Sequence, residues 1–118
     1  MIIWITKFVI LKLIILCLSS DTIKSHGCWK DNFGIGQQRP IPWVQDCHAA
    51  DNGPLKCCTE VARSQGFSHF ALQASGACMT SIDAGAKYKM HGSSSACPSS
   101  GLGGPYLNEV YEIIRGKI

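Results

Sequence analysis

The sequence predicts a small α+β domain, rich in disulfides, in which one helix packs on a short antiparallel sheet. Three observations predict this fold class: an even set of cysteines after the first 20 residues, an amphipathic segment that ends at a glycine, and an alternating apolar segment after that glycine. The chain has 118 residues, which suits one domain with a modest core. We expect about three to five short strands.

The first 20 residues resemble a secretory signal peptide. Large apolar side chains dominate this segment, Lys7 and Lys12 interrupt it, and it ends in two serines. A membrane anchor is the alternative, and apolar residues before Lys7 keep it open, but a lysine near the centre of a span costs about 2.5–3.5 kcal/mol. We expect a signal peptide over 1–20, one domain over 21–118 and a secreted, extracellular product that does not insert into membranes after cleavage.

The formal net charge argues against two classes of partner. It is +3 for the whole chain and falls to +1 when the two lysines of the signal peptide are removed. Nucleic acids and anionic membranes attract clustered Lys and Arg residues, which a nearly neutral domain does not offer. We therefore expect no nucleic-acid partner, and we expect the domain to be a monomer.

The segment before the helix is expected to hold one strand and two loops. The strand lies near 27–30, and the segment 32–38 is polar and rich in glycine, which is typical of a loop. Two prolines force 39–43 into an extended path with few ladder hydrogen bonds. A second loop, 46–53, leads to the helix.

The helix is expected over 54–65. Apolar residues recur there at helical spacing, and they are Leu55, Cys58, Val61 and Ala62. Pro54 suits the first helical position, where its missing N–H needs no partner. Gly66 suits the position after the helix, where a residue in the left-handed conformation often ends it.

Three further strands are expected after the helix. They lie near 67–73, 77–80 and 108–113. In the first of them, Phe70 and Leu72 face one side of the sheet because side chains alternate along a strand. His69 and Gln73 face the other side, and Gly76 permits the turn that follows.

Six cysteines remain once Cys17 leaves with the signal peptide, namely Cys28, Cys47, Cys57, Cys58, Cys78 and Cys97. An even number of cysteines in a short exported chain predicts a disulfide framework. Adjacent Cys57 and Cys58 cannot pair with each other without severe strain, so we expect them to have different partners. The residues alone leave the rest of the pairing open.

Short motifs in a fixed order resemble a WSC-like module, a cysteine-rich type of extracellular and cell-surface domain. In chain order they are Gly27-Cys28-Trp29-Lys30-Asp31, Cys58-x-Glu60-Val61-Ala62-Arg63-x-x-Gly66-Phe67, Phe70-Ala71-Leu72-Gln73, Cys78, Tyr88-Lys89-x-x-Gly92, Cys97 and Gly103-Gly104-Pro105-x-x-Asn108-x-Val110-Tyr111. The resemblance spans 27–113 and implies an extracellular protein that binds carbohydrate or matrix.

The resemblance also implies disulfide pairs. The implied pairs are Cys28–Cys97 and Cys58–Cys78, and the two cysteines that remain form the third pair, Cys47–Cys57. WSC domains proper usually have eight cysteines and the most similar modules four, so Cys47 and Cys57 look like an added pair. Tyr106 stands where those modules often have Trp, and His91 stands where they often have Tyr.

No motif in the sequence predicts catalysis or a metal site. Neither Cys-x-x-Cys nor His-x-x-x-His spacing occurs, so the histidines are expected to be scattered over the surface. A phospholipase-like site needs a histidine on the helix after the Cys-Cys pair, and a serine hydrolase needs Gly-x-Ser-x-Gly; both are missing. Glu109 and Glu112 are expected on opposite faces of their strand, as solvated charges. We expect no enzyme, no cofactor and no metal.

Aromatic residues outside the core are the candidates for binding. Trp29 and Tyr111 are assigned to packing, whereas Trp43 follows a proline and Tyr88 and Tyr106 lie in polar segments, so these three rings are expected to be exposed. Exposed rings stack on the C–H faces of sugars while amides bond hydroxyls. The predicted ligand-binding residues are Trp43, Tyr88, His91, Tyr106 and Asn108.

Two functions are consistent with these expectations. The first is a secreted, non-catalytic recognition module for carbohydrate or an extracellular glycoprotein of the matrix. The alternative is a secreted disulfide-rich effector of the toxin or defence class that acts on a protein target, because a signal peptide followed by one small module suits both. His91 is expected to make ligand binding depend on pH in the mildly acidic range, where imidazole gains a proton.

Overall fold

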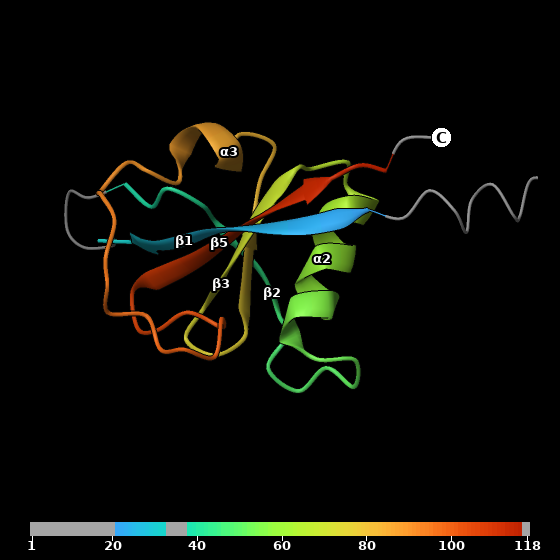
Figure 1. The fold of residues 1–118 in the computed structure, drawn as a ribbon, viewed down its shortest axis with the longest axis horizontal. Helices are drawn as coiled ribbons and strands as arrows, with labels where there is room; N and C mark the ends of the chain where they lie inside the picture. Colours follow the sequence, from blue (N-terminus) through green and yellow to red (C-terminus); the bar gives the residue numbers. More distant parts are fainter. Residues whose placement is uncertain (1–20, 33–37, 117–118) are drawn as a thin grey trace, which may run out of the picture.

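The chain folds into one five-stranded antiparallel sheet with a helix on each face (Figure 1). The computed structural model describes residues 21–32 and 38–116, so the predicted signal peptide lies outside the described residues. The strands are β1 (Thr22–Lys30), β2 (Trp43–Asp46), β3 (His69–Gln73), β4 (Ala77–Thr80) and β5 (Leu107–Ile114), in the sheet order β1-β5-β3-β4-β2. The helices are α2 (Pro54–Ser64) and the short α3 (Ala84–Lys87). The predicted α+β class is confirmed.

Helix α2 begins and ends within one residue of its predicted limits. Pro54 is its first residue, as expected. At the other end, the N–H of Gly66 donates to the Arg63 carbonyl at 3.0 Å, and the N–H of Phe67 donates to the Ala62 carbonyl at 3.0 Å. These two bonds form a Schellman motif, in which the residue after the cap adopts a left-handed conformation. Gly66 has a φ of 78°, which glycine adopts without strain.

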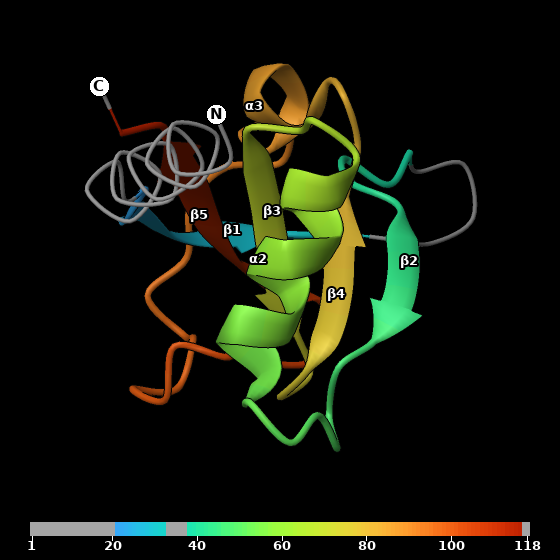
Figure 2. The same ribbon diagram turned by 90° about the vertical axis from the view of Figure 1, so that its right-hand side faces the viewer.

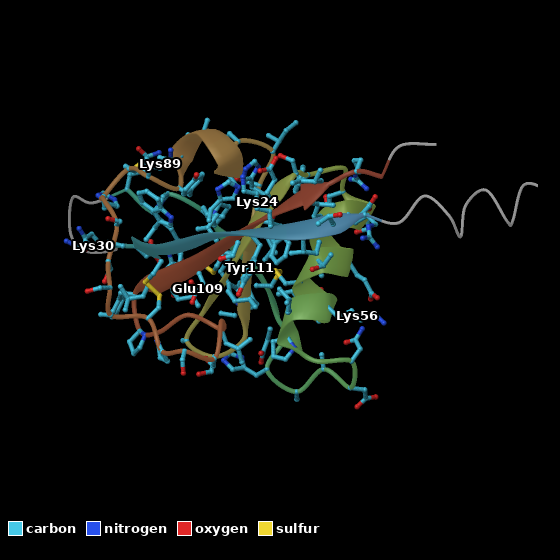
Figure 3. All side chains as sticks on the ribbon, in the orientation of Figure 1. Lys24, Lys30, Lys56, Lys89, Glu109 and Tyr111 are labelled. Atoms are coloured by element: carbon cyan, nitrogen blue, oxygen red, sulfur yellow. A yellow bond between two sulfur atoms is a disulfide. The ribbon has the colours of Figure 1, made fainter. Side chains whose placement is uncertain are left out.

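Alternation along the strands creates one apolar core on each face of the sheet. The α2-side core contains Cys47, Cys58, Ala62, Phe70, Leu72, Cys78 and Ile113. The α3-side core contains Ile41, Ala71, Met79, Ala84, Tyr88 and Val110. Figure 2 shows α2 lying over β3 and β4, and Figure 3 shows Lys24 on one side of β1 and β5, with Glu109 and Tyr111 on the other. The predicted common face of Phe70 and Leu72 is therefore confirmed.

Three disulfides connect the helix, the sheet and the long loop before β5. Cys58–Cys78 joins α2 to β4, Cys47–Cys57 joins the turn after β2 to α2, and Cys28–Cys97 joins β1 to that loop. These three pairs are the predicted ones: two were implied by the resemblance to a WSC-like module, and the third joined the two cysteines that remained. Adjacent Cys57 and Cys58 have different partners, as expected.

Three elements differ from the prediction. Strand β1 begins at Thr22, earlier than expected, because β5 continues to Ile114 and pairs with it over its whole length. Strand β2 occupies part of the segments that were expected to be extended chain and loop. Both prolines precede Trp43, so they do not interrupt the pairing of β2 with β4. The short helix α3 was not predicted, since four residues carry no apolar periodicity.

A β-bulge in β1 determines which way His26 points. Ser25 pairs with Tyr111 and Gly27 pairs with Val110, so His26 is an extra residue in its strand. Gly27 has a φ of 86°, which glycine adopts readily in bulges. Residues three apart on a regular strand face opposite sides, but this bulge places His26 and Trp29 on the same side, where both rings contact Tyr88.

His48 holds the turn between β3 and β4 against the loop after β2. Its backbone N–H and its ring both bond to Asp46 Oδ1, and its Nε2 lies 2.7 Å from the Ala74 carbonyl oxygen. The hydrogen bond to Asp46, followed by the bond to the Ala74 carbonyl, raises the pKa of His48. Protonated His48 donates from both ring nitrogens, so its ring bonds to Asp46 and to the Ala74 carbonyl at the same time only in the charged form.

The substitution His48→Gln is expected to lower the melting temperature at acidic pH and to change it little at alkaline pH. Because the pKa is raised on folding, the stabilisation is present below the unfolded-state pKa of about 6.5 and is lost as the pH rises through the folded-state pKa. Thermal unfolding of both proteins between about pH 5.5 and about pH 9 measures this difference. Asp46→Asn is expected to remove the same pH dependence. An equal loss at every pH would contradict the assignment.

Candidate functional site

The structure does not gather the five predicted binding residues on one exposed surface. Trp43 is 54% exposed and Tyr106 is 60% exposed, as expected for both rings. Tyr88 is only 6% exposed and Asn108 is fully buried, so the expectation that these two lie on the surface is wrong. His91 is half-buried.

Tyr88 is buried because the segment 81–92, which includes α3, folds over the sheet. Its ring meets Trp29 edge-on with centroids 5.1 Å apart, and it stacks on His69 with centroids 6.0 Å apart. The ammonium group of Lys89 lies 5.5 Å from the Tyr88 ring centroid and 5.8 Å from that of Trp29. A single tyrosine in a polar segment carries no periodic signal, which is why the sequence suggested an exposed position.

A buried polar network lies where β1 and β3 end and β5 begins. Gln73 Nε2 donates to Asp31 Oδ2 at 2.6 Å and to Asn108 Oδ1 at 3.0 Å, and Arg39 Nε lies 3.3 Å from Asp31 Oδ2. Burial raises the pKa of Asp31, while the Gln73 hydrogen bond and the Arg39 charge oppose that shift. Among the described residues, Asp31 Oδ1 and Asn108 Nδ2 are buried without a hydrogen-bond partner. We call Asp31, Arg39, Gln73 and Asn108 the Asp31 network.

The Asp31 network connects three of the five predicted residues. Asn108 belongs to it, the Tyr106 carbonyl accepts a 2.9 Å hydrogen bond from the Asp31 N–H, and His91 lies close enough for its charge to act on Asp31. Trp43 lies apart from them, on the edge strand β2 at the other end of the sheet from β1. Sequence reasoning missed Asp31 as a functional candidate, although it closes the first of the motifs that carry the resemblance.

A second cluster joins His26, His69 and Glu112 on the α3 side. Glu112 Oε1 lies 2.8 Å from His26 Nε2 and 3.8 Å from His69 Nε2. Burial lowers the pKa of His69, and the hydrogen bond from His26 lowers the pKa of Glu112. The expectation of scattered histidines is therefore wrong for His26 and His69, and Glu112 is bonded to His26 while its side chain stays 31% exposed. These residues come from β1, β3 and β5, and the sequence does not reveal the register that brings the strands together.

A groove of about 480 Å³ lies beside α2, away from the predicted site. Its apolar lining includes Ile23, Leu55 and Leu102, and its charged lining includes Lys56, Glu60 and Arg63. None of the five predicted residues lines this groove. It therefore gives no support to the predicted binding surface.

No family model, no curated protein and no solved structure matches this chain. The resemblance to a WSC-like module therefore stays a prediction that rests on the motifs. A function has to be argued from the exposed rings, the Asp31 network and the histidine cluster themselves.

Proposed function

We propose that this chain is a secreted, non-catalytic recognition module that binds carbohydrate, and that Tyr106 lies at the centre of its binding surface. The observation that carries this proposal is an exposed aromatic ring on a strained, tight turn beside the buried Asp31 network. The resemblance to WSC-like modules implies the same class of ligand.

Tyr106 lies at the tip of a two-residue turn that is fixed on both sides. The N–H of Gly104 donates to the Leu107 carbonyl at 3.2 Å, and the N–H of Leu107 donates to the Gly104 carbonyl at 3.0 Å. Tyr106 has a φ of 56°, a left-handed conformation that destabilises a residue with a Cβ by about 1–2 kcal/mol. Strained residues of this kind persist where the surrounding structure holds them, and they cluster at binding sites.

The Asp31 network holds the base of this turn. The N–H of Asp31 donates to the Tyr106 carbonyl at 2.9 Å, and the Asp31 side chain is fully buried and bonded to Gln73. A ring on a rigid base binds a ligand with little loss of conformational entropy. Aromatic faces stack on the C–H groups of sugars, and exposed Trp43 offers a second such face on β2.

The three disulfides support an extracellular location. Disulfides form and persist in oxidising compartments such as the secretory pathway and the cell exterior. Across residues 21–32 and 38–116, no helix has both the length and the apolar character needed to cross a membrane. The resemblance of residues 1–20 to a signal peptide supplies the proposed route of export.

A glycan array probed with the purified, oxidised chain tests the proposal. The wild type is expected to bind a defined class of glycans, and Tyr106→Ala is expected to weaken that binding at least about tenfold, as loss of a central aromatic contact does. Ile82→Ala is the matched control, because it removes another exposed apolar side chain, and it is expected to bind as the wild type does. Both variants are expected to keep the wild-type melting temperature.

Two outcomes would contradict this proposal. If the wild type binds no glycan but acts on a receptor or in a toxicity assay, the effector alternative replaces the carbohydrate-binding function. If folded Tyr106→Ala binds glycans as tightly as the wild type, Tyr106 is not at the centre of the binding surface.

A further inference from the structure

The cluster of His26, His69 and Glu112 brings three metal-binding atoms together in a half-buried position. One ligand atom from each residue lies within 4.8 Å of the other two. Glu112 Oε1 is 2.8 Å from His26 Nε2 and 3.8 Å from His69 Nε2. Ligand atoms around a tetrahedral zinc ion lie about 3.3 Å apart, and these two distances fall on either side of that value.

Rigid backbone positions all three side chains. His69 on β3 and Glu112 on β5 are direct register partners, so their side chains lie opposite each other on one face of the sheet. The bulge at His26 turns its ring to the same face from β1, the neighbouring strand on the other side of β5. Sites built on adjacent strands of a sheet hold their geometry better than sites on loops.

Neighbouring groups orient the His69 ring. Ser68 Oγ lies 2.7 Å from His69 Nδ1, so an Nδ1–H that donates to this hydroxyl leaves the lone pair of Nε2 facing Glu112. Tyr88 stacks on one side of the ring, and Gly85 leaves room for it, since a Cβ at Gly85 would lie 2.6 Å from His69 Nδ1. Metal-binding histidines are typically held by such contacts at the second ring nitrogen.

We propose that His26, His69 and Glu112 form a zinc site with three protein ligands. Two imidazoles and one carboxylate are the ligand set of open zinc sites, in which the fourth position takes water or an atom of a bound molecule. Ferrous iron uses the same ligand set, but the oxidising surroundings that maintain the disulfides favour zinc. The ion takes the place of the proton between His26 and Glu112, and that proton goes to solvent. This site does not depend on the proposed carbohydrate function.

Lys24 is a positively charged group whose charge acts on Glu112 and opposes a cation at this site. It is the register partner of Glu112 on β1, so its side chain starts on the same face of the sheet. Its positive charge competes with the ion for the Glu112 carboxylate. Replacing Lys24 by Gln is therefore expected to tighten zinc binding about two- to tenfold.

Zinc titration of the purified, oxidised chain without an affinity tag, in competition with a chromogenic chelator, tests the proposal. The wild type is expected to bind one zinc ion and to melt at a higher temperature with zinc, because the ion binds only the folded state. His69→Ala and Glu112→Gln are each expected to lower the affinity at least about tenfold. His91→Ala is the matched control, since it removes a half-buried histidine outside the cluster and leaves the affinity unchanged.

A variant that keeps all three ligand residues distinguishes loss of the zinc site from loss of the fold. Ser68→Ala removes only the hydroxyl that contacts His69 Nδ1, and it is expected to weaken zinc binding while the disulfides and the melting temperature without zinc stay the same. The site is ruled out if the wild type binds no zinc in the presence of the chelator. It is also ruled out if folded Glu112→Gln and Ser68→Ala both bind zinc as tightly as the wild type.

Discussion

Replacing Cys28 and Cys97 together by alanine is expected to lower the free energy of unfolding by about 4 kcal/mol. This disulfide joins residues 69 positions apart, so its removal frees a long loop in the unfolded state. Both cysteines are only half-buried, and little packing is lost when the sulfurs are removed. Urea unfolding of the wild type and the variant measures the difference, with the m-value fitted separately for each because the freed loop changes the unfolded state.

The Cys47–Cys57 bridge provides the control for this prediction. It joins residues only 10 positions apart, so the same loop-entropy model predicts a loss of about 2.5 kcal/mol when both become alanine. Cys47 is fully buried in the α2-side core, so its replacement also removes packing, and the difference between the two double variants is a lower limit for the effect of loop length. If the short bridge proved the more stabilising of the two, unfolded-state entropy would not be the main contribution.

Replacing Tyr88 by alanine is expected to lower the free energy of unfolding by about 3–5 kcal/mol. Its ring is 6% exposed and fills the space between Trp29, His69 and the α3 side of the sheet. The remaining side chains cannot close such a space, so the variant loses both buried apolar area and contacts. Denaturant unfolding monitored by far-UV circular dichroism gives the midpoint and the m-value.

Tyr106 gives a matched comparison for this substitution. It is 60% exposed, so Tyr106→Ala is expected to change stability by no more than about 0.5 kcal/mol. Tyr88→Phe, which keeps the buried ring, is expected to stay much closer to the wild type than Tyr88→Ala does. Equal losses for Tyr88→Ala and Tyr106→Ala would mean that the segment 81–92 does not pack on the sheet in solution.

Local signals account for the parts of the fold that the sequence predicts well. Pro54 and Gly66 mark the two ends of α2 through backbone chemistry that needs no tertiary contact. The alternation of side chains along β3 is likewise a local property of an extended strand, and it places Phe70 and Leu72 on the face that packs under α2.

Positions that depend on strand register are the ones that the sequence does not reveal. The extra residue at His26 is visible only when β1 is aligned with β5, and this alignment is what brings His26 to Glu112. The burial of Tyr88 likewise depends on α3, a helix too short to leave a periodic pattern. Asn108 was expected on the surface because it is polar, but its partner Gln73 lies 35 residues earlier in the chain.

The pairing of β1 with β5 sets an order for maturation. The six disulfide cysteines are synthesised in chain order, so Cys28 is the first of them, and Cys97 and β5 follow only after the other four. Until then the thiol of Cys28 has no native partner, and its thiolate form can exchange with bridges that form beside it. Cys28–Cys97 is therefore the last of the three bridges that can close during synthesis, because its second cysteine is the last of the six to appear.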